Sequence, residues 1–290
     1  MKAGPPRSPG GLQPSWRFLR SGPLPGPLNM GLDEVLVTSC ARGEGPPTLR
    51  LYTWDPPTVS VGYAQALEGE VDLEACRRLG FGVVRRMTGG RAVLHQHELT
   101  YAIAFPEGLL GPGGIQEDYR RISQGLIAGL RRLGVTADLS RGSGRRGAVS
   151  GVCFLSSSRF ELCVAGRKLV GSAQRRLRGA VLQHGSLLLD LDRAAWEATL
   201  PALQHPNASA WAGSVTTLAA LLGTRPPLVR VAAALRDGFE EALQHPLPET
   251  LPSRVEAQAA AALARARYAQ ADWNNRQQRP APRLDTPQRL

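Results

Sequence analysis

The segment Arg85-Arg86-Met87-Thr88-Gly89-Gly90-Arg91-Ala92-Val93-Leu94-His95 carries the strongest fold signal in the sequence. An apolar run at 81–84 leads into the segment, the Gly89-Gly90 pair interrupts it, and an apolar run resumes at 92–94. Paired glycines allow a sharp backbone bend and let a ligand lie directly against main-chain N–H groups. The segment therefore predicts two strands joined by a polar bend.

A second segment far downstream, Gly166–Gln174, repeats this pattern. It places Lys168 on an apolar strand that is followed by the small residues Gly171, Ser172 and Ala173. Small residues beside the polar side chains of both segments predict a narrow polar mouth on an apolar interior. Either segment alone could also be no more than two strands and a turn, so their function depends on what surrounds them.

The pattern on either side of these segments predicts an α+β fold. Strands are expected at 16–19, 48–54, 58–62, 81–86, 91–94, 99–105, 136–139, 159–164, 168–170 and 181–191. Helices are expected at 29–41, 72–79, 116–133, 194–204, 211–222, 228–243 and 253–268, so the part from about 193 is helical. We expect a disordered lead-in at 1–15, one domain at 16–271 and a tail at 272–290.

The net charge of +11 narrows the choice of partners. Such a charge attracts polyanions and speeds encounter with acidic proteins. Nucleic acid is the usual candidate, but the arginines are spread along the chain, aromatic residues make up only 6%, and no nucleic-acid motif is present. An acidic protein partner fits at least as well, and a general preference for arginine is a third explanation.

Other features exclude several classes of protein. Four scattered cysteines without CxxC spacing argue against a disulfide framework or a zinc site and favour the cytoplasm. The uncharged stretch 198–224 is interrupted by prolines and Asn207, so no membrane span is expected. His95 and His97 could form a metal pair on one strand face, but no further ligand spacing is evident. We therefore expect neither a metal nor a cofactor.

Two cysteines are candidate nucleophiles. Residues 141–152 form a loop rich in glycine, serine and arginine, and Cys153 follows it directly. The GxGxxG pattern at 142–147 lacks the following helix of a dinucleotide site, so a flexible loop is the better interpretation. If Ala165-Gly166 forms a two-residue turn, Cys163 lies opposite Lys168, whose charge would lower the thiol pKa. The residues alone slightly favour Cys163.

Together these segments resemble the biotin/lipoate protein ligase family, and within it the octanoyltransferase branch. The similarity extends over most of residues 16–275 and is carried by residues 46–50, 56–63, 85–101, 153–154, 161–174, 182–186, Asn29-Met30 and Trp273-Asn274. The resemblance implies mixed or antiparallel sheets with flanking helices and an acyl tunnel bordered by the two glycine segments.

The resemblance also implies roles for individual residues. Cys153 matches the nucleophile of the octanoyltransferase branch, and Lys168 matches the lysine that assists it. The positions that match the acyl-binding pocket are Arg86, Thr88, Gly89, Gly90, Arg91, His95, Gly171, Ser172, Ala173, His184 and Gly185. The implied reaction transfers octanoyl from an acidic acyl carrier protein to a lysine of a lipoyl-carrier domain, through a cysteine thioester. The implied acceptors are the glycine-cleavage H protein or a 2-oxoacid dehydrogenase E2 domain.

The sequence departs from the ATP-dependent lipoate ligases of this family. Those enzymes carry three successive glycines in the first segment, where this chain has Arg91 in the third place. Their Asn-Asp-containing adenylate segment also has no match here. Both departures favour thiol chemistry over ligation. The alternatives are a lipoate ligase, an amidotransferase that moves octanoyl between carrier domains and, in a different class, a basic nucleic-acid-binding protein.

Overall fold

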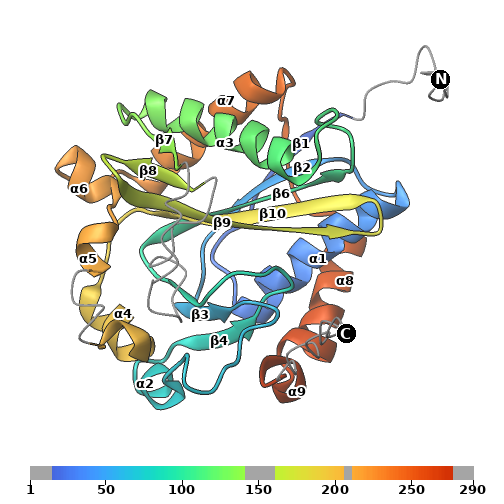
Figure 1. Cartoon of the computed structure of the whole chain (residues 1–290). Coiled ribbons are helices and arrows are strands. Elements are labelled where there is room, and N and C mark those ends of the chain that lie inside the picture. Colours follow the sequence, from blue (N-terminus) through green and yellow to red (C-terminus); the bar gives the residue numbers. More distant parts are fainter. Residues whose placement is uncertain (1–14, 141–160, 206–210, 277–290) are drawn as a thin grey trace, which may run out of the picture.

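Two mixed β-sheets of unequal size form the centre of the structure (Figure 1). The computed structural model describes residues 15–140, 161–205 and 211–276. The large sheet has the order β11-β1-β2-β6-β10-β9-β8-β7, and the small sheet has the order β4-β3-β5. Parallel pairs β1–β11, β1–β2 and β3–β4 occur beside antiparallel pairs. The predicted α+β class with mixed sheets and a helical C-terminal part is confirmed.

The strands are short except for the three that cross the centre of the large sheet. Their bounds are β1 (Arg17–Arg20), β2 (Thr48–Tyr52), β3 (Thr58–Val61), β4 (Gly82–Arg85), β5 (Val93–His95), β6 (Glu98–Pro106), β7 (Asp138–Leu139), β8 (Leu162–Val164), β9 (Arg167–Leu177), β10 (Ala180–Leu188) and β11 (Glu249–Thr250). The predicted hairpin about Ala165-Gly166 is confirmed. However, β9 continues to Leu177, so the second glycine segment lies on a strand rather than after one.

The helices cover both faces of the large sheet and one end of the small one (Figure 1). Their bounds are α1 (Gly26–Arg42), α2 (Leu73–Arg78), α3 (Gly114–Arg132), α4 (Arg193–Thr199), η2 (Pro201–Leu203), α5 (Trp211–Ser214), α6 (Leu218–Leu222), α7 (Leu228–Leu243), α8 (Arg254–Leu263), the π-helical turn η4 (Ala264–Tyr268) and α9 (Ala271–Asn274). None of the helices in the described ranges is long and apolar enough to span a bilayer.

Alternation along the central strands separates two cores. On β6, Tyr101 and Ile103 pack into the core under α3 and α7, whereas Ala102 and Ala104 face α1 and α8. Side chains of a strand point alternately to opposite faces, so one strand supplies both cores. A third apolar cluster joins the small sheet to α4 and α5. Between the small sheet and the α1 face of the large sheet lie the polar side chains of Ser60, Arg86, His95, Thr100 and His184.

Two predicted boundaries need correction. Helix α1 begins at Gly26, three residues before its predicted start, with Pro27 in its first turn, and Asn29 is completely buried inside the helix. Residues 272–274 do not begin the expected tail, because α9 is held to the body. The Arg85 backbone N–H donates to Asn274 Oδ1 at 2.7 Å, and Trp273 Nε1 donates to the Arg85 carbonyl at 2.9 Å. Residues 1–14 and 277–290 lie outside the described ranges.

Candidate active site

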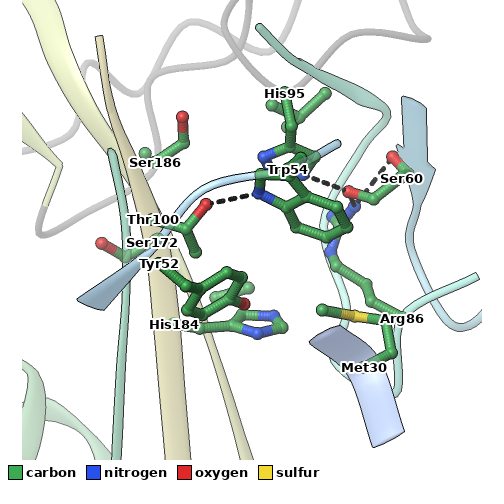
Figure 2. A pocket seen from close by; sticks show the side chains of 14 residues that line it. Met30, Tyr52, Trp54, Ser60, Arg86, His95, Thr100, Ser172, His184 and Ser186 are labelled. Atoms are coloured by element: carbon green, nitrogen blue, oxygen red, sulfur yellow. Dashed lines mark hydrogen bonds between the residues drawn. The ribbon is translucent and has the colours of Figure 1, made fainter. Parts of the chain in front are cut away.

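A cavity opens between the large sheet and the small one, beneath the first turn of α1. Figure 2 shows its walls. The cavity is narrow, with a volume of about 30 Å³, well below that of typical small-molecule pockets. Strands β2, β3, β5, β6, β9 and β10 contribute side chains, together with α1 and the residues that follow β2 and β4. The lining residues are Met30, Tyr52, Trp54, Ser60, Arg86, Val93, His95, Thr100, Gly171, Ser172, Ala173, His184, Gly185 and Ser186.

Arg86 holds the first glycine segment in place. Its guanidinium donates from Nη1 to the Ser60 carbonyl and hydroxyl, at 3.1 and 3.0 Å. Its Nη2 donates to the carbonyls of Gly89 and Arg91, both at 2.8 Å. Gly90 has φ +91, a left-handed conformation that favours glycine. Arg86 therefore closes the Gly89-Gly90 bend onto β3, at the cavity wall.

The second glycine segment forms the opposite wall. Gly171, Ser172 and Ala173 on β9 pair directly with residues 186, 185 and 184 of β10. Gly185 lies where the backbones come close together, because a Cβ at that position would be 2.5 Å from the Gly171 carbonyl oxygen and 2.7 Å from Tyr101. Apart from His184, this wall therefore carries only small side chains or none.

A methyl group at Gly185 is expected to destabilise the protein. In Gly185→Ala the new Cβ would meet a strand carbonyl that cannot move without breaking the β9–β10 ladder. Overpacking of this kind costs about 1–3 kcal/mol, which a urea unfolding curve measures. The control is Gly213→Ala on α5, where no atom lies within 4 Å of the added Cβ. Equal stability of both variants would contradict the close approach.

His95 forms one side of the cavity. Its ring stacks on Trp54 with centroids 4.1 Å apart, and its Nε2 lies 2.8 Å from Ser60 Oγ (Figure 2). Burial lowers the pKa of His95 below its ordinary value of 6.5, although Glu98 acts in the opposite direction. Strand β5 ends at His95, and His97 adopts φ +54 with its Nδ1 near Arg225. The metal-pair interpretation required both histidines to lie on one strand face. They do not, because only His95 belongs to the strand.

A buried polar chain, which the sequence did not indicate, lies behind the cavity. Asp33 on α1 accepts from Arg50 Nη1 at 2.7 Å and contacts His184 Nδ1 at 3.0 Å. His184 Nε2 in turn lies 2.6 Å from Thr88 Oγ1. Burial alone would raise the pKa of Asp33, but Arg50, followed by His184 and Tyr52, outweighs it and holds that pKa below 3.8. The only hint of this polar chain in the local sequence is the spacing of Asn29 and Asp33, which are four residues apart and so lie on one face of a helix. Both accept hydrogen bonds from Arg50.

Lys168 and Cys163 face each other across the β8–β9 hairpin, as the turn prediction required. Lys168 Nζ pairs with Glu161 Oε1 at 2.5 Å, and each side chain is only 4% exposed. Burial and the Glu161 carboxylate raise the pKa of the Cys163 thiol, and Lys168 offsets them only in part. Because the thiolate is the nucleophile, this environment weakens the case for Cys163. Cys153 and the 141–152 loop lie outside the described residues.

The structure brings most of the expected binding residues to one place. Those that line the cavity are Arg86, His95, Gly171, Ser172, Ala173, His184 and Gly185. Thr88, Gly89, Gly90 and Arg91 form the bend that borders it, although the Arg91 side chain points outward to lie 3.9 Å from Glu70. Lys168 does not line the cavity and lies three residues before Gly171 on β9.

Comparisons with known proteins agree with this architecture. An octanoyltransferase LipM from Symbiobacterium thermophilum is 44% identical over 275 residues, which cover 91% of this chain and all of that protein. Another octanoyltransferase LipM, from Kyrpidia tusciae, is also 44% identical, over 90% of this chain and 99% of its own. A solved bi-partite lipoate protein ligase from Thermoplasma acidophilum superposes with a TM-score of 0.76, covering 92% of this chain and 99% of its own.

The solved ligase is only 24% identical in sequence. Its similarity to this chain therefore establishes the fold alone. Residues 25–240 match the family described as the lipoyl protein ligase A/B catalytic domain, which is most of the chain and includes both glycine segments. The chain belongs to the lipoyl protein ligase A/B catalytic domain family.

Proposed function

We propose that this chain is an octanoyltransferase. It takes octanoyl from the thioester of an acyl carrier protein and joins it to a lysine of a lipoyl-carrier domain. The observation that carries the proposal is the cavity walled by both glycine segments, in a chain that is 44% identical to octanoyltransferase LipM over nearly its whole length. A narrow cavity with one wall of mostly small side chains suits an unbranched acyl chain, because it leaves no room for bulky groups.

Cys153 is the proposed nucleophile. Its thiolate attacks the thioester carbonyl and expels the carrier thiolate, which takes up a proton as the octanoyl–cysteine thioester forms. The acceptor lysine then attacks as a neutral amine, loses a proton as the amide forms and releases the Cys153 thiolate. The acyl group arrives already activated, so this sequence needs no ATP. Main-chain N–H groups of a glycine segment are suited to hold the developing oxyanion.

Lys168 is the proposed partner of this thiol. Its ammonium group lies beside the Glu161 carboxylate, so it favours the thiolate form of a cysteine brought close to it only where the ammonium group is the nearer of the two charges. The net charge of +11 suits an acidic carrier protein as donor. The proposed acceptors are the glycine-cleavage H protein or an E2 lipoyl domain, in the cytoplasm.

The direct test is acylation of the purified enzyme. Incubation with octanoyl–acyl carrier protein, without ATP, should add the mass of one octanoyl group, and hydroxylamine should remove it as expected for a thioester. Adding the acceptor domain should transfer that mass to it. A strict requirement for ATP and free octanoate or lipoate would instead identify a ligase. Clear preference for an octanoylated lipoyl domain as donor would identify an amidotransferase.

A further inference from the structure

The buried chain Asp33–His184–Thr88 connects a helix, a strand and the first glycine segment. Its three side chains are almost inaccessible to solvent, with residue exposures of 1%, 5% and 0%. His184 lines the cavity, whereas Asp33 stands behind it on α1. Buried polar groups need hydrogen-bond partners, so losing one member of this chain leaves its neighbour without the partner that the protein supplies.

The Asp33 carboxylate determines which His184 nitrogen carries a proton. Asp33 is held by Arg50 Nη1 at 2.7 Å and by Tyr52 Oη at 2.8 Å, which leaves it ionised and able only to accept. His184 Nδ1, 3.0 Å from Asp33 Oδ2, must therefore be the donor. In the neutral ring, Nε2 is then an acceptor, and the Thr88 hydroxyl donates to it at 2.6 Å.

Thr88 links His184 to the Gly89-Gly90 bend. Its carbonyl accepts from the Tyr63 backbone N–H at 2.8 Å, and the next residues, Gly89 and Gly90, are exposed. Gly62 lies so close that a Cβ there would be 2.0 Å from the Gly90 carbonyl oxygen. The bend thus packs on the small sheet, and the Thr88 hydroxyl ties it to β10 of the large sheet.

We propose that Asp33 is a positioning residue for the acyl site: through His184 it holds Thr88, and with it the Gly89-Gly90 bend, against the cavity. Asp33 itself contacts no substrate. The carboxylate–imidazole–hydroxyl chain serves to fix one wall of the cavity relative to the other, rather than to activate the hydroxyl as a nucleophile. The activity test of this proposal rests on the proposed octanoyltransferase function. The position of the proton on His184 can be measured without it.

The proton assignment can be measured directly. In protein labelled with ¹⁵N-histidine, a long-range ¹H–¹⁵N spectrum at neutral pH should show His184 as the Nδ1–H tautomer, and Asp33→Asn should disturb that pattern. His184→Gln identifies the signal. A wild-type His184 that carries its proton on Nε2 would overturn the proposal. This result is independent of whether the wild type transfers octanoyl, so failure of the proposed function would be seen separately.

The activity test compares two substitutions at Thr88. Thr88→Val keeps the shape and removes the hydroxyl, so kcat/KM for octanoyl–acyl carrier protein should fall about tenfold, mainly through KM, which corresponds to about 1.4 kcal/mol. Thr88→Ser keeps the hydroxyl and should stay within about twofold of the wild type. The matched control is Thr199→Val, an equally buried threonine on α4 whose hydroxyl bonds to a helix carbonyl.

A double-mutant cycle separates positioning from simple loss of stability. If Asp33 acts through His184 on Thr88, the loss of kcat/KM in Asp33→Asn/Thr88→Val should be clearly smaller than the product of the two single losses. Independent, multiplicative losses would overturn the proposal. Equal KM values in Thr88→Val and Thr88→Ser would also overturn it.

Discussion

In Cys153→Ala the rate of octanoyl transfer is expected to fall about a thousandfold or more. Removing the nucleophile abolishes the covalent route and leaves only substrate binding and polarisation of the thioester carbonyl. Intact-mass analysis should show no added octanoyl group after incubation with the octanoyl carrier. The rate of transfer to the acceptor domain, measured at saturating donor, gives the magnitude. Cys153→Ser should also lose the hydroxylamine-sensitive intermediate, since a serine hydroxyl is a much weaker nucleophile at neutral pH.

Cys163→Ala is the matched control for this loss. Cys163 lies directly opposite Lys168, so it has the geometry of a nucleophile, but burial and Glu161 raise its thiol pKa. It should therefore retain most of the activity and still acquire one octanoyl group. A fully active Cys153→Ala together with an inactive Cys163→Ala would show that the wrong thiol has been assigned.

The sequence predicted the walls of the site because their chemistry is local. Paired glycines and small residues on apolar strands mark backbone that must bend or approach closely, and both segments do line one cavity. The hairpin about Ala165-Gly166 likewise depends on two adjacent residues, and its register places Cys163 opposite Lys168. Such features can be found by examining a few neighbouring residues.

The polar network behind the walls could not be predicted in the same way. The alternation of β2 places Leu49 and Leu51 on one face, and Arg50 then falls on the other, where an exposed arginine would fit equally well. Instead Arg50 is completely buried beneath α1, paired with Asp33. His184 is 151 positions from Asp33, and Thr88 is 96 positions from His184, so only the tertiary fold reveals the chain.

The contacts of the C-terminal segment could not be predicted from the local sequence either. Trp273 and Asn274 follow an alanine-rich helix and look locally like the start of a tail. In the structure the Arg85 guanidinium donates from Nη2 to the Asn274 carbonyl at 2.7 Å, so the end of the described chain braces the strand that precedes the first glycine segment. The bonding partner lies 189 residues away, and no local pattern encodes it.

Asp33→Ala is expected to cost about 3–5 kcal/mol of unfolding free energy, because it leaves the Arg50 guanidinium buried without its counter-charge. The other hydrogen-bond partners of Arg50, Asn29 and Ser21, are neutral oxygen acceptors, and its remaining contact is with the Tyr52 ring, so none of them replaces a carboxylate. Urea unfolding at neutral pH measures the loss. A change below about 1 kcal/mol would show that the pair is not buried as described.

The control is Glu117→Ala on α3, which removes a carboxylate bonded to Arg120 and Arg121 at the surface. Hydrogen bonds from Arg120 and then Arg121 lower the pKa of Glu117 to about 2. Even so, solvent screens exposed pairs, so this variant should unfold at nearly the wild-type urea concentration. The contrast between the two variants separates the effect of burial from the effect of charge pairing.

The pH dependence gives the sign of the Asp33 contribution. The pKa of Asp33 in the folded protein lies below its ordinary value of 3.8. Burial raises this pKa, but the charge of Arg50 and the hydrogen bonds that Asp33 accepts together outweigh burial. A carboxyl with a depressed folded-state pKa stabilises the protein fully above its unfolded-state pKa, and this contribution disappears as the pH falls through the folded-state value. The part of the stability gap between wild type and Asp33→Ala that comes from the ionised carboxylate should therefore be fully present at neutral pH and narrow below about pH 4. A gap that widens in acid would mean that Asp33 is protonated in the folded protein, and the Nδ1–H assignment for His184 would then lose its basis.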